Sequence, residues 1–227
     1  MAMNKTELCD HFMRNATEIR NSLIVKSDNK YNPIDKNLSP IPPFYGTDDI
    51  KLIIIGQDPT IRNKEQRSKI TITLNLKTPG SLLRYIQDDI CSKLGISIEN
   101  VYATDLFKYF YTKPPADTPR VLLQHFSENL KLLIEEINIF PGVPIITLGE
   151  PILKLLANEL KYQKVRFHWD YDKNTGNSNH NFRYCPKEKN KLGRVIFPFP
   201  HQPSLRKNFY QETFPVYLNF MKLQMKS

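Results

Sequence analysis

The sequence predicts an α/β fold, a three-layer α/β/α sandwich around a central, mainly parallel four-stranded sheet. Three observations lead to this prediction. Short apolar runs, most clearly those of the first and third predicted strands, are typical of parallel strands that are covered on both faces, although such runs alone do not exclude buried helices. Segments with apolar residues at helical spacing lie between the runs. An order in which strands alternate with helices favours a mainly parallel sheet.

The first predicted strand follows a stiff loop at residues 32–46, where four prolines fix the backbone. This strand, KLIII, stops abruptly at the polar corner GQDPT. The four strands are predicted at residues 50–55, 101–104, 143–148 and 194–199.

The predicted helices begin and end at recognisable signals. Thr6 can cap the first helix, Ser81 can cap the second, and Gly95 has the usual C-terminal role after the second. The third helix carries a stripe of Val, Leu and Ile and runs into Pro141-Gly142. The helices are predicted at residues 6–25, 81–94, 118–140 and 152–160.

The length and charge of the chain narrow the range of functions. A chain of 227 residues is expected to form one domain over residues 1–227, since a single core suffices at this size. The 32 Lys and Arg residues outnumber the 23 Asp and Glu residues, which gives a net charge of +9. A polyanion is therefore the expected partner.

Cysteine use and the N-terminal composition predict a cellular location. Cys9, Cys91 and Cys185 are odd in number and far apart, so neither a disulfide framework nor a CxxC metal site is expected. The sequence has no signal-peptide core and no apolar stretch that approaches the ~18 residues needed to span a bilayer. We expect a cytoplasmic protein without membrane contact.

A basic segment at about residues 161–194 interrupts the alternation of strands and helices. It holds nine Lys or Arg residues against three Asp or Glu residues, and its centre, NTGN, is rich in turn-forming residues. We interpret it as an insertion, a β-like excursion or hairpin before the last strand. Its aromatic residues suit base stacking beside phosphate attraction, or they cover the core; the sequence leaves both open.

Polar residues follow three of the predicted strands. Gln57 and Asp58 follow the first strand, Asp105 follows the second, and His201 follows the last. In a parallel sheet the ligand site lies beyond the carboxyl ends of the strands, so we expect these side chains at one edge. Two acids and an imidazole suit acid/base or electrostatic catalysis.

Four motifs in the same order resemble the uracil-DNA glycosylase superfamily. GQDP at residues 56–59 resembles the family's GQDPY motif, and HQPSL at residues 201–205 resembles its HPSPLS motif. YATDLFK at residues 102–108 is similar to the strand that carries the family's base-reading amide, and LGE at residues 148–150 falls at the family's Gly-Ser corner. The similarity covers about residues 40–160 and 194–225.

The resemblance implies hydrolysis of the N-glycosidic bond of a flipped base in DNA, with no metal or nucleotide cofactor. Asp58 would stabilise the cationic sugar and orient the attacking water. His201 would donate a hydrogen bond to the base O2 as negative charge develops there, with help from Gln57. Thr60 and Asp105 would complete the base pocket.

The resemblance also implies contacts to single- or double-stranded DNA that carries a damaged or modified base. Leu205 would fill the hole left by the flipped base. Arg206 and Lys207 would bind backbone phosphates, and the loops of Ser81 and Ser204 would hold the strand. We expect the protein to act on DNA as a monomer.

Two positions depart from the family pattern. Thr60 stands where the family has a tyrosine that closes the pocket against a 5-methyl group, so a larger base is expected to fit. Asp105 stands where the family has an amide, and an ionised carboxylate only accepts hydrogen bonds. This position argues against ordinary uracil selectivity. The stretch of residues 71–77, which matches the stacking segment, holds Leu74 and Asn75 but no Phe or Tyr.

Simpler interpretations remain open at each site. Asp58 would also suit a helix or turn cap, Asp105 would suit an ion pair with Lys108 or a turn cap, and Leu205 would suit a core residue. His201 fits a loop histidine. The alternative function is a catalytically weak or inactive DNA-binding or decoy protein that keeps the fold. A nucleotide-handling protein is disfavoured, because no GxGxxG or GxxxxGK[ST] loop follows a strand.

Overall fold

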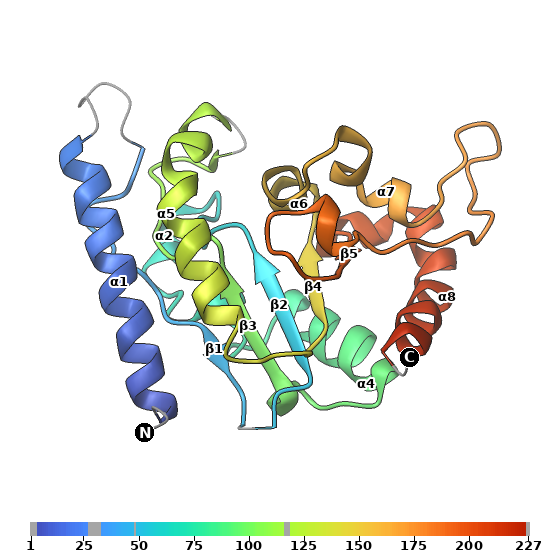
Figure 1. The fold of residues 1–227 in the computed structure, drawn as a ribbon, viewed down its shortest axis with the longest axis horizontal. Helices are drawn as coiled ribbons and strands as arrows, with labels where there is room; N and C mark the ends of the chain where they lie inside the picture. Colours follow the sequence, from blue (N-terminus) through green and yellow to red (C-terminus); the bar gives the residue numbers. More distant parts are fainter. Residues whose placement is uncertain (1–3, 27–32, 48, 116–118, 226–227) are drawn as a thin grey trace.

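A five-stranded sheet with the order β1-β3-β2-β4-β5 forms the centre of the protein (Figure 1). The computed structural model describes residues 4–26, 33–47, 49–115 and 119–225. Four strands are parallel, as predicted, and the α/β fold class is confirmed. They are β2 (Leu52–Gly56), β3 (Val101–Asp105), β4 (Ile145–Leu148) and β5 (Ile196–Phe199).

A short antiparallel edge strand was not predicted. β1 consists of Phe44–Tyr45 and pairs with Ala103 and Tyr102 of β3. Every residue of the four parallel strands is buried, which explains why their sequences are mainly apolar rather than alternating. Two residues carry too little pattern to be recognised as a strand.

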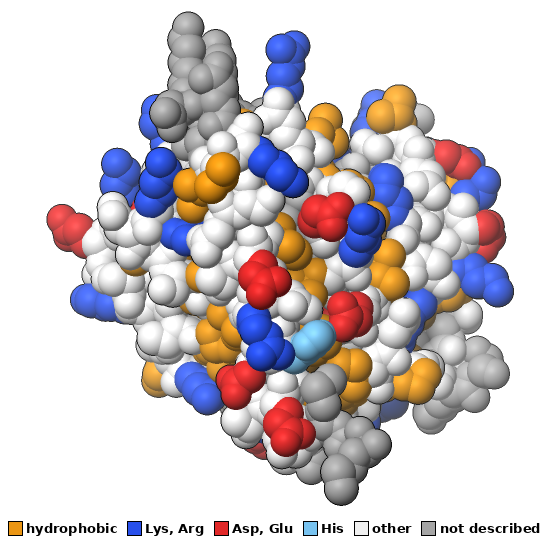
Figure 2. Space-filling view, turned by 60° about the vertical axis from the view of Figure 1, so that its left-hand side comes forward, with side chains coloured by type: hydrophobic (Ala, Val, Ile, Leu, Met, Phe, Trp, Pro, Cys, Tyr) orange, Lys and Arg blue, Asp and Glu red, His pale blue; other side chains and the backbone are white. Residues whose placement is uncertain are grey.

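Helices cover both sides of the sheet. Figure 1 shows α1 (Lys5–Lys26) beside α5 (Pro119–Ile137), while α8 (Asn208–Gln224) lies near α4 (Ser92–Leu94) at the other side. Figure 2 turns the side of α1 and α5 forward, and it shows acidic and basic side chains interspersed there, so this side does not present charge of one sign. None of the helices in the described ranges is long and apolar enough to cross a membrane.

The helix predicted at residues 81–94 contains a π-helical segment, which propensity does not reveal. It comprises α3 (Ser81–Arg84), the π-helical Tyr85–Cys91, and α4, and it ends at Gly95 as predicted. The predicted cap is wrong: Gly80 occupies the N-cap position, and Ser81 is the first helical residue. The hydroxyl of Tyr85 donates a hydrogen bond to the Pro200 carbonyl at 3.0 Å, so this segment supports the loop after β5.

The basic segment is mainly irregular with short helical turns, and the expected β-like excursion is limited to a small hairpin. It contains α7 (Val165–His168), and a bridge between Tyr171 and Ser178 forms a hairpin only around the predicted turn. Trp169 is fully buried, stacks on Tyr217 with ring centroids 4.3 Å apart, and donates to the Pro198 carbonyl. Burial of apolar aromatic surface therefore anchors this segment to the core.

The remaining helices lie in or directly after the loops that follow β2, β4 and β5. α6 (Glu150–Leu156) begins directly after β4, and α2 (Lys64–Arg67) lies in the loop after β2. α8 had not been predicted; its interior Pro215 is a residue that normally disfavours a helix. Burial of its apolar face against the core outweighs that preference.

Candidate active site

Asp58 follows β2 and is held by two hydrogen bonds. Its Oδ1 accepts from the Thr60 backbone N–H at 2.9 Å, and its Oδ2 accepts from Gln57 Nε2 at 2.7 Å. The first contact is the turn expected of an aspartate, so the simpler interpretation describes part of its role. Burial raises the pKa of the Asp58 carboxyl above its usual value, and hydrogen bonds from Thr60 and Gln57 partly offset the rise.

The side chains of Gln57 and Thr60 both support this corner. The Gln57 amide is turned toward Asp58, while its backbone carbonyl accepts a hydrogen bond from the Phe107 N–H at 2.9 Å. The Thr60 hydroxyl accepts from the Tyr111 N–H at 2.8 Å. These contacts join the loop after β2 to the chain after β3, which fixes the position of the Asp58 carboxyl.

Asp105 ends β3 and lies against Gly56, its register partner on β2. A Cβ atom built on Gly56 would lie 2.1 Å from Asp105 Oδ1, so only glycine leaves room for this carboxyl. Asp105 is 1% exposed, and neither carboxylate oxygen has a hydrogen-bond partner among the described residues. Burial, and then the nearby charge of Asp58, raise the pKa of Asp105 to about 8.

Lys108 does not pair with the Asp105 carboxyl, so an ion pair with Lys108 does not explain the presence of Asp105 at this position. The Lys108 ammonium forms an ion pair with Glu136 Oε2 at 2.6 Å, and it also donates to the Thr104 hydroxyl and to the backbone carbonyl of Asp105. An ammonium has three N–H donors, and these three contacts use all of them. Tyr102 donates to the same glutamate.

His201 follows β5 and packs against the corner after β4. The Gly149 N–H donates to the Phe199 carbonyl at 2.7 Å, and a Cβ on Gly149 would lie 3.2 Å from His201 Cβ. Gly149 has φ of +89°, which other residues rarely adopt. His201 keeps an exposed surface, but partial burial of its ring disfavours the charged form and lowers the pKa of the imidazole below its usual value.

The topology brings the predicted site residues to one edge of the sheet. Asp58 follows β2, Asp105 ends β3 and His201 follows β5; β3 is parallel to β2 directly, and β5 is parallel to β2 through β4. Neighbouring strands lie about 4.8 Å apart, so the ends of β2 and β5, separated by β4, are roughly 10 Å apart.

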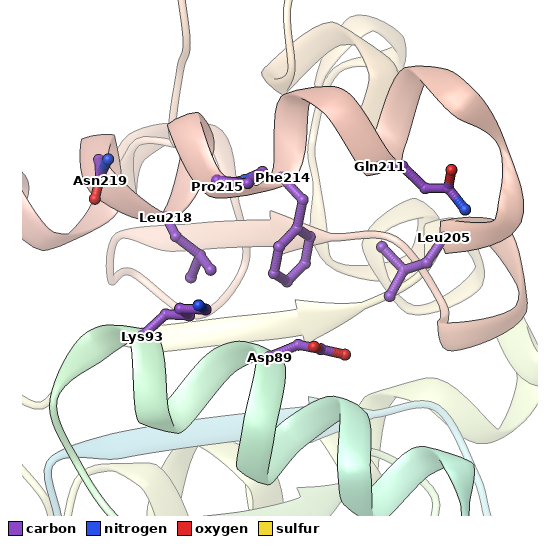
Figure 3. Close-up of a pocket in the computed structure, with 8 residues that line it drawn as sticks. All are labelled: Asp89, Lys93, Leu205, Gln211, Phe214, Pro215, Leu218 and Asn219. Atoms are coloured by element: carbon purple, nitrogen blue, oxygen red, sulfur yellow. The ribbon is translucent and has the colours of Figure 1, made fainter.

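Two clefts flank the 3₁₀ helix Gln202–Arg206. His201, Ser204 and Lys207 line a cleft of about 410 Å³ that also includes Arg166; Asp58 does not line it. Leu205 lines a second cleft of about 570 Å³ between α8 and the helix of residues 81–94. Figure 3 shows the side chains of Leu205 and Phe214 entering this space from above, with Asp89 below.

The other predicted DNA contacts lie at the surface. Ser81, Arg206 and Lys207 are exposed. Leu205 is half-buried, so it packs against the core and still presents some surface.

Among the residues that the structure describes, no group of three or more His, Cys, Asp or Glu side chains is arranged to hold a metal ion.

Leu74 lies at the same corner as Asp105, although sequence patterns did not assign it a role. Its Cδ2 would lie 3.2 Å from a Cβ on Gly56, beside the Asp105 carboxyl. Leu74 and the next residue, Asn75, have φ of 55° and 52°, a left-handed conformation that costs energy for residues with a side chain. Only the missing aromatic residue in this stretch signalled that the segment differs from the family pattern.

Comparison with known proteins supports the resemblance in the motifs. In a comparison with curated proteins, none matches the chain. The family model described as the uracil DNA glycosylase superfamily matches residues 43–222, which include all five strands and the loops after β2, β3 and β5. The chain therefore belongs to the uracil-DNA glycosylase superfamily.

Proposed function

We propose that this protein is a monofunctional DNA glycosylase that acts, as one domain and as a monomer, on a flipped base in DNA. The observation that carries the proposal is the arrangement of Asp58 and His201 at the same sheet edge, two strands apart, in a chain of this superfamily. The net charge of +9 favours a polyanionic substrate.

The reaction hydrolyses the bond between C1′ and the base nitrogen. The bonding electrons leave with the base, the oxygen of a water molecule bonds to C1′, and one proton of that water ends on the departing base. Ionised Asp58 stabilises the positive charge on the sugar and orients the water. It acts as an anion, so its raised pKa limits activity on the acid side.

His201 acts on the departing base. Because its pKa is lowered, the imidazole is neutral at neutral pH and donates one N–H to the base O2 as negative charge develops there. Thr60 and Asp105 contact the base, and Leu205 fills the gap in the duplex. Ser81, Ser204, Arg206 and Lys207 contact the backbone.

A panel of duplex and single-stranded oligonucleotides, each with one modified base, tests the proposal by the yield of abasic sites. We expect cleavage at one class of base and a loss of about 10²–10³ in rate for Asp58→Asn with DNA affinity retained. Binding without cleavage of any base would instead support the DNA-binding or decoy function.

A further inference from the structure

The strongest unexplained feature of the site is the Asp105 carboxyl. It is 1% exposed, and among the described residues neither of its oxygens accepts or donates a hydrogen bond. A buried polar group without a partner is costly, so such groups are rare in folded proteins unless a ligand completes them. The position of this carboxyl at the carboxyl edge of the sheet is where ligands bind in this kind of fold.

The charges around Asp105 oppose its ionisation. Asp58 follows the neighbouring strand and is itself a carboxylate, and Glu136 from α5 adds a second negative charge. The cation that acts on Asp105 is Lys108, but Glu136 neutralises this ammonium at 2.6 Å and its donors are fully used. The segment Thr73–Asn75 contributes no titratable group at this point. The carboxyl thus faces the Asp58 carboxylate and a Lys108–Glu136 ion pair whose two charges largely offset each other.

We propose that Asp105 enters the site as a neutral carboxylic acid and reads the Watson–Crick edge of a flipped pyrimidine with one donor and one acceptor. The proposal rests on the proposed function, since it names the base class of the same site. It also replaces the earlier expectation, drawn from an ionised carboxylate, that this position argues against uracil.

A neutral acid is complementary to two pyrimidine edges, because its proton can sit on either oxygen. Against a uracil-type edge, the O–H donates to O4 and the carbonyl accepts from N3–H. Against a cytosine-type edge, the proton sits on the other oxygen, so the O–H donates to N3 and the carbonyl accepts from the N4 amino group. An ionised carboxylate would repel O4 of the first and the N3 lone pair of the second.

Leu74 and Thr60 fit this reading. Leu74 lies beside the carboxyl and is half-buried, so a base that reaches Asp105 packs against this aliphatic side chain. Thr60 has a small side chain and leaves room for substituents on the base. Discrimination against ordinary paired cytosine then rests on flipping, which costs less for a mispaired or single-stranded base.

Equilibrium binding to DNA that cannot be cleaved tests this proposal separately from hydrolysis. The probes are duplexes with one 2′-fluorinated deoxyuridine or deoxycytidine, and the reference is the same duplex with an abasic analogue. The difference in affinity isolates base recognition from backbone contacts. With the pKa of Asp105 at about 8, this difference should fall about tenfold between pH 7 and pH 9 for both bases.

Asp105→Asn is the matched variant, because an amide has nearly the same shape but does not titrate. This variant should keep the base-dependent affinity, and that affinity should no longer decrease at alkaline pH. Asp105→Ala should lose the base-dependent affinity at every pH. A ¹³C titration of the carboxyl in the free protein, assigned with Asp105→Asn, should report the same proton without DNA.

The outcomes separate this proposal from the proposed function. The neutral-acid proposal is overturned if the base-dependent affinity does not change with pH, if Asp105→Asn leaves its pH profile unchanged, or if the affinity exists for only one of the two bases. It is also overturned if no base-dependent affinity is found at any pH. A pH-dependent affinity for both bases without abasic sites supports it and removes the hydrolysis.

Discussion

The Asp105 carboxyl occupies the space that a side chain on Gly56 would need, at the ends of two paired strands. Its Oδ1 lies 2.1 Å from the position that a Cβ atom on Gly56 would take. The glycine of the GQDP motif is therefore needed to leave room for a side chain of the neighbouring strand. In the proposed function, recognition of the base through Asp105 and chemistry at Asp58 would therefore both depend on this one backbone corner.

Gly56→Ala should displace the Asp105 carboxyl, because the added methyl overlaps it. We expect a loss of about 1–3 kcal/mol in the free energy of unfolding and weaker base recognition, with backbone binding retained. Gly80→Ala is the control, since its Cβ would meet no atom closer than 3.9 Å. Denaturant unfolding and binding to modified and abasic duplexes measure both effects. Equal behaviour of the two variants contradicts the close approach.

Asp105→Asn should stabilise the protein increasingly as pH rises. Below about pH 4 the carboxyl is protonated in both the folded and the unfolded chain. Between about pH 4 and pH 8 the unfolded chain is ionised at this position while the folded chain is neutral, so wild type loses stability relative to the variant. The difference in free energy of unfolding should grow by at most about 1.4 kcal/mol per pH unit and level off above pH 8.

Chemical denaturation of both proteins across this pH range measures the difference. A constant difference from pH 4 to pH 9 would show that Asp105 ionises normally in the folded protein, and a change of opposite sign would show that it is stabilised as an anion.

Leu205→Ala should weaken binding to a flipped-base duplex by about tenfold or more, because the leucine side chain no longer fills the vacated stack. Gln211→Ala is the matched control, as Gln211 is exposed and lines the same cleft. Fluorescence of 2-aminopurine next to the target base reports the flipping. A Leu205→Ala protein that flips the base as wild type does would assign Leu205 to packing alone.

Arg206→Ala and Lys207→Ala should each lower the dependence of DNA affinity on salt. Each phosphate contact contributes about −0.9 to the slope of log K against log[salt] in duplex DNA, so each variant should lose about that amount. Lys131→Ala on α5 is the control, because Lys131 is exposed and pairs with Glu128 at 3.0 Å, away from the predicted DNA contacts in the chain. If only the Lys131 variant changes the slope of log K against log[salt], the proposed phosphate contacts of Arg206 and Lys207 are wrong.

The sequence predicted the parallel strands and the edge at which they bring the polar residues together. Continuous apolar runs identify strands covered on both faces, and the strand ends then fall at one edge for topological reasons. Local patterns did not reveal β1, which has two residues, or the π-helical segment, whose hydrogen bonds depend on packing. α8 was missed at Pro215, where tertiary burial outweighs propensity.

The site residues were recognisable by type, but their electrostatic states were not. Whether Asp105 pairs with Lys108 depends on Glu136, which lies on a different helix and is 31 residues away from Asp105 in the chain. The role of Leu74 depends on a left-handed backbone that its sequence does not favour. Both features arise from contacts between distant segments, which no local pattern encodes.

The central claim is that one extruded base lies between Asp58 and His201. A crystal structure with a duplex that carries a 2′-fluorinated deoxyuridine tests it directly. We predict that the base leaves the helix, that its O2 lies about 2.7–3.2 Å from a ring nitrogen of His201, and that C1′ faces the Asp58 carboxylate. A base that stays stacked in the duplex, or that binds with these two side chains in separate surroundings, would contradict the claim.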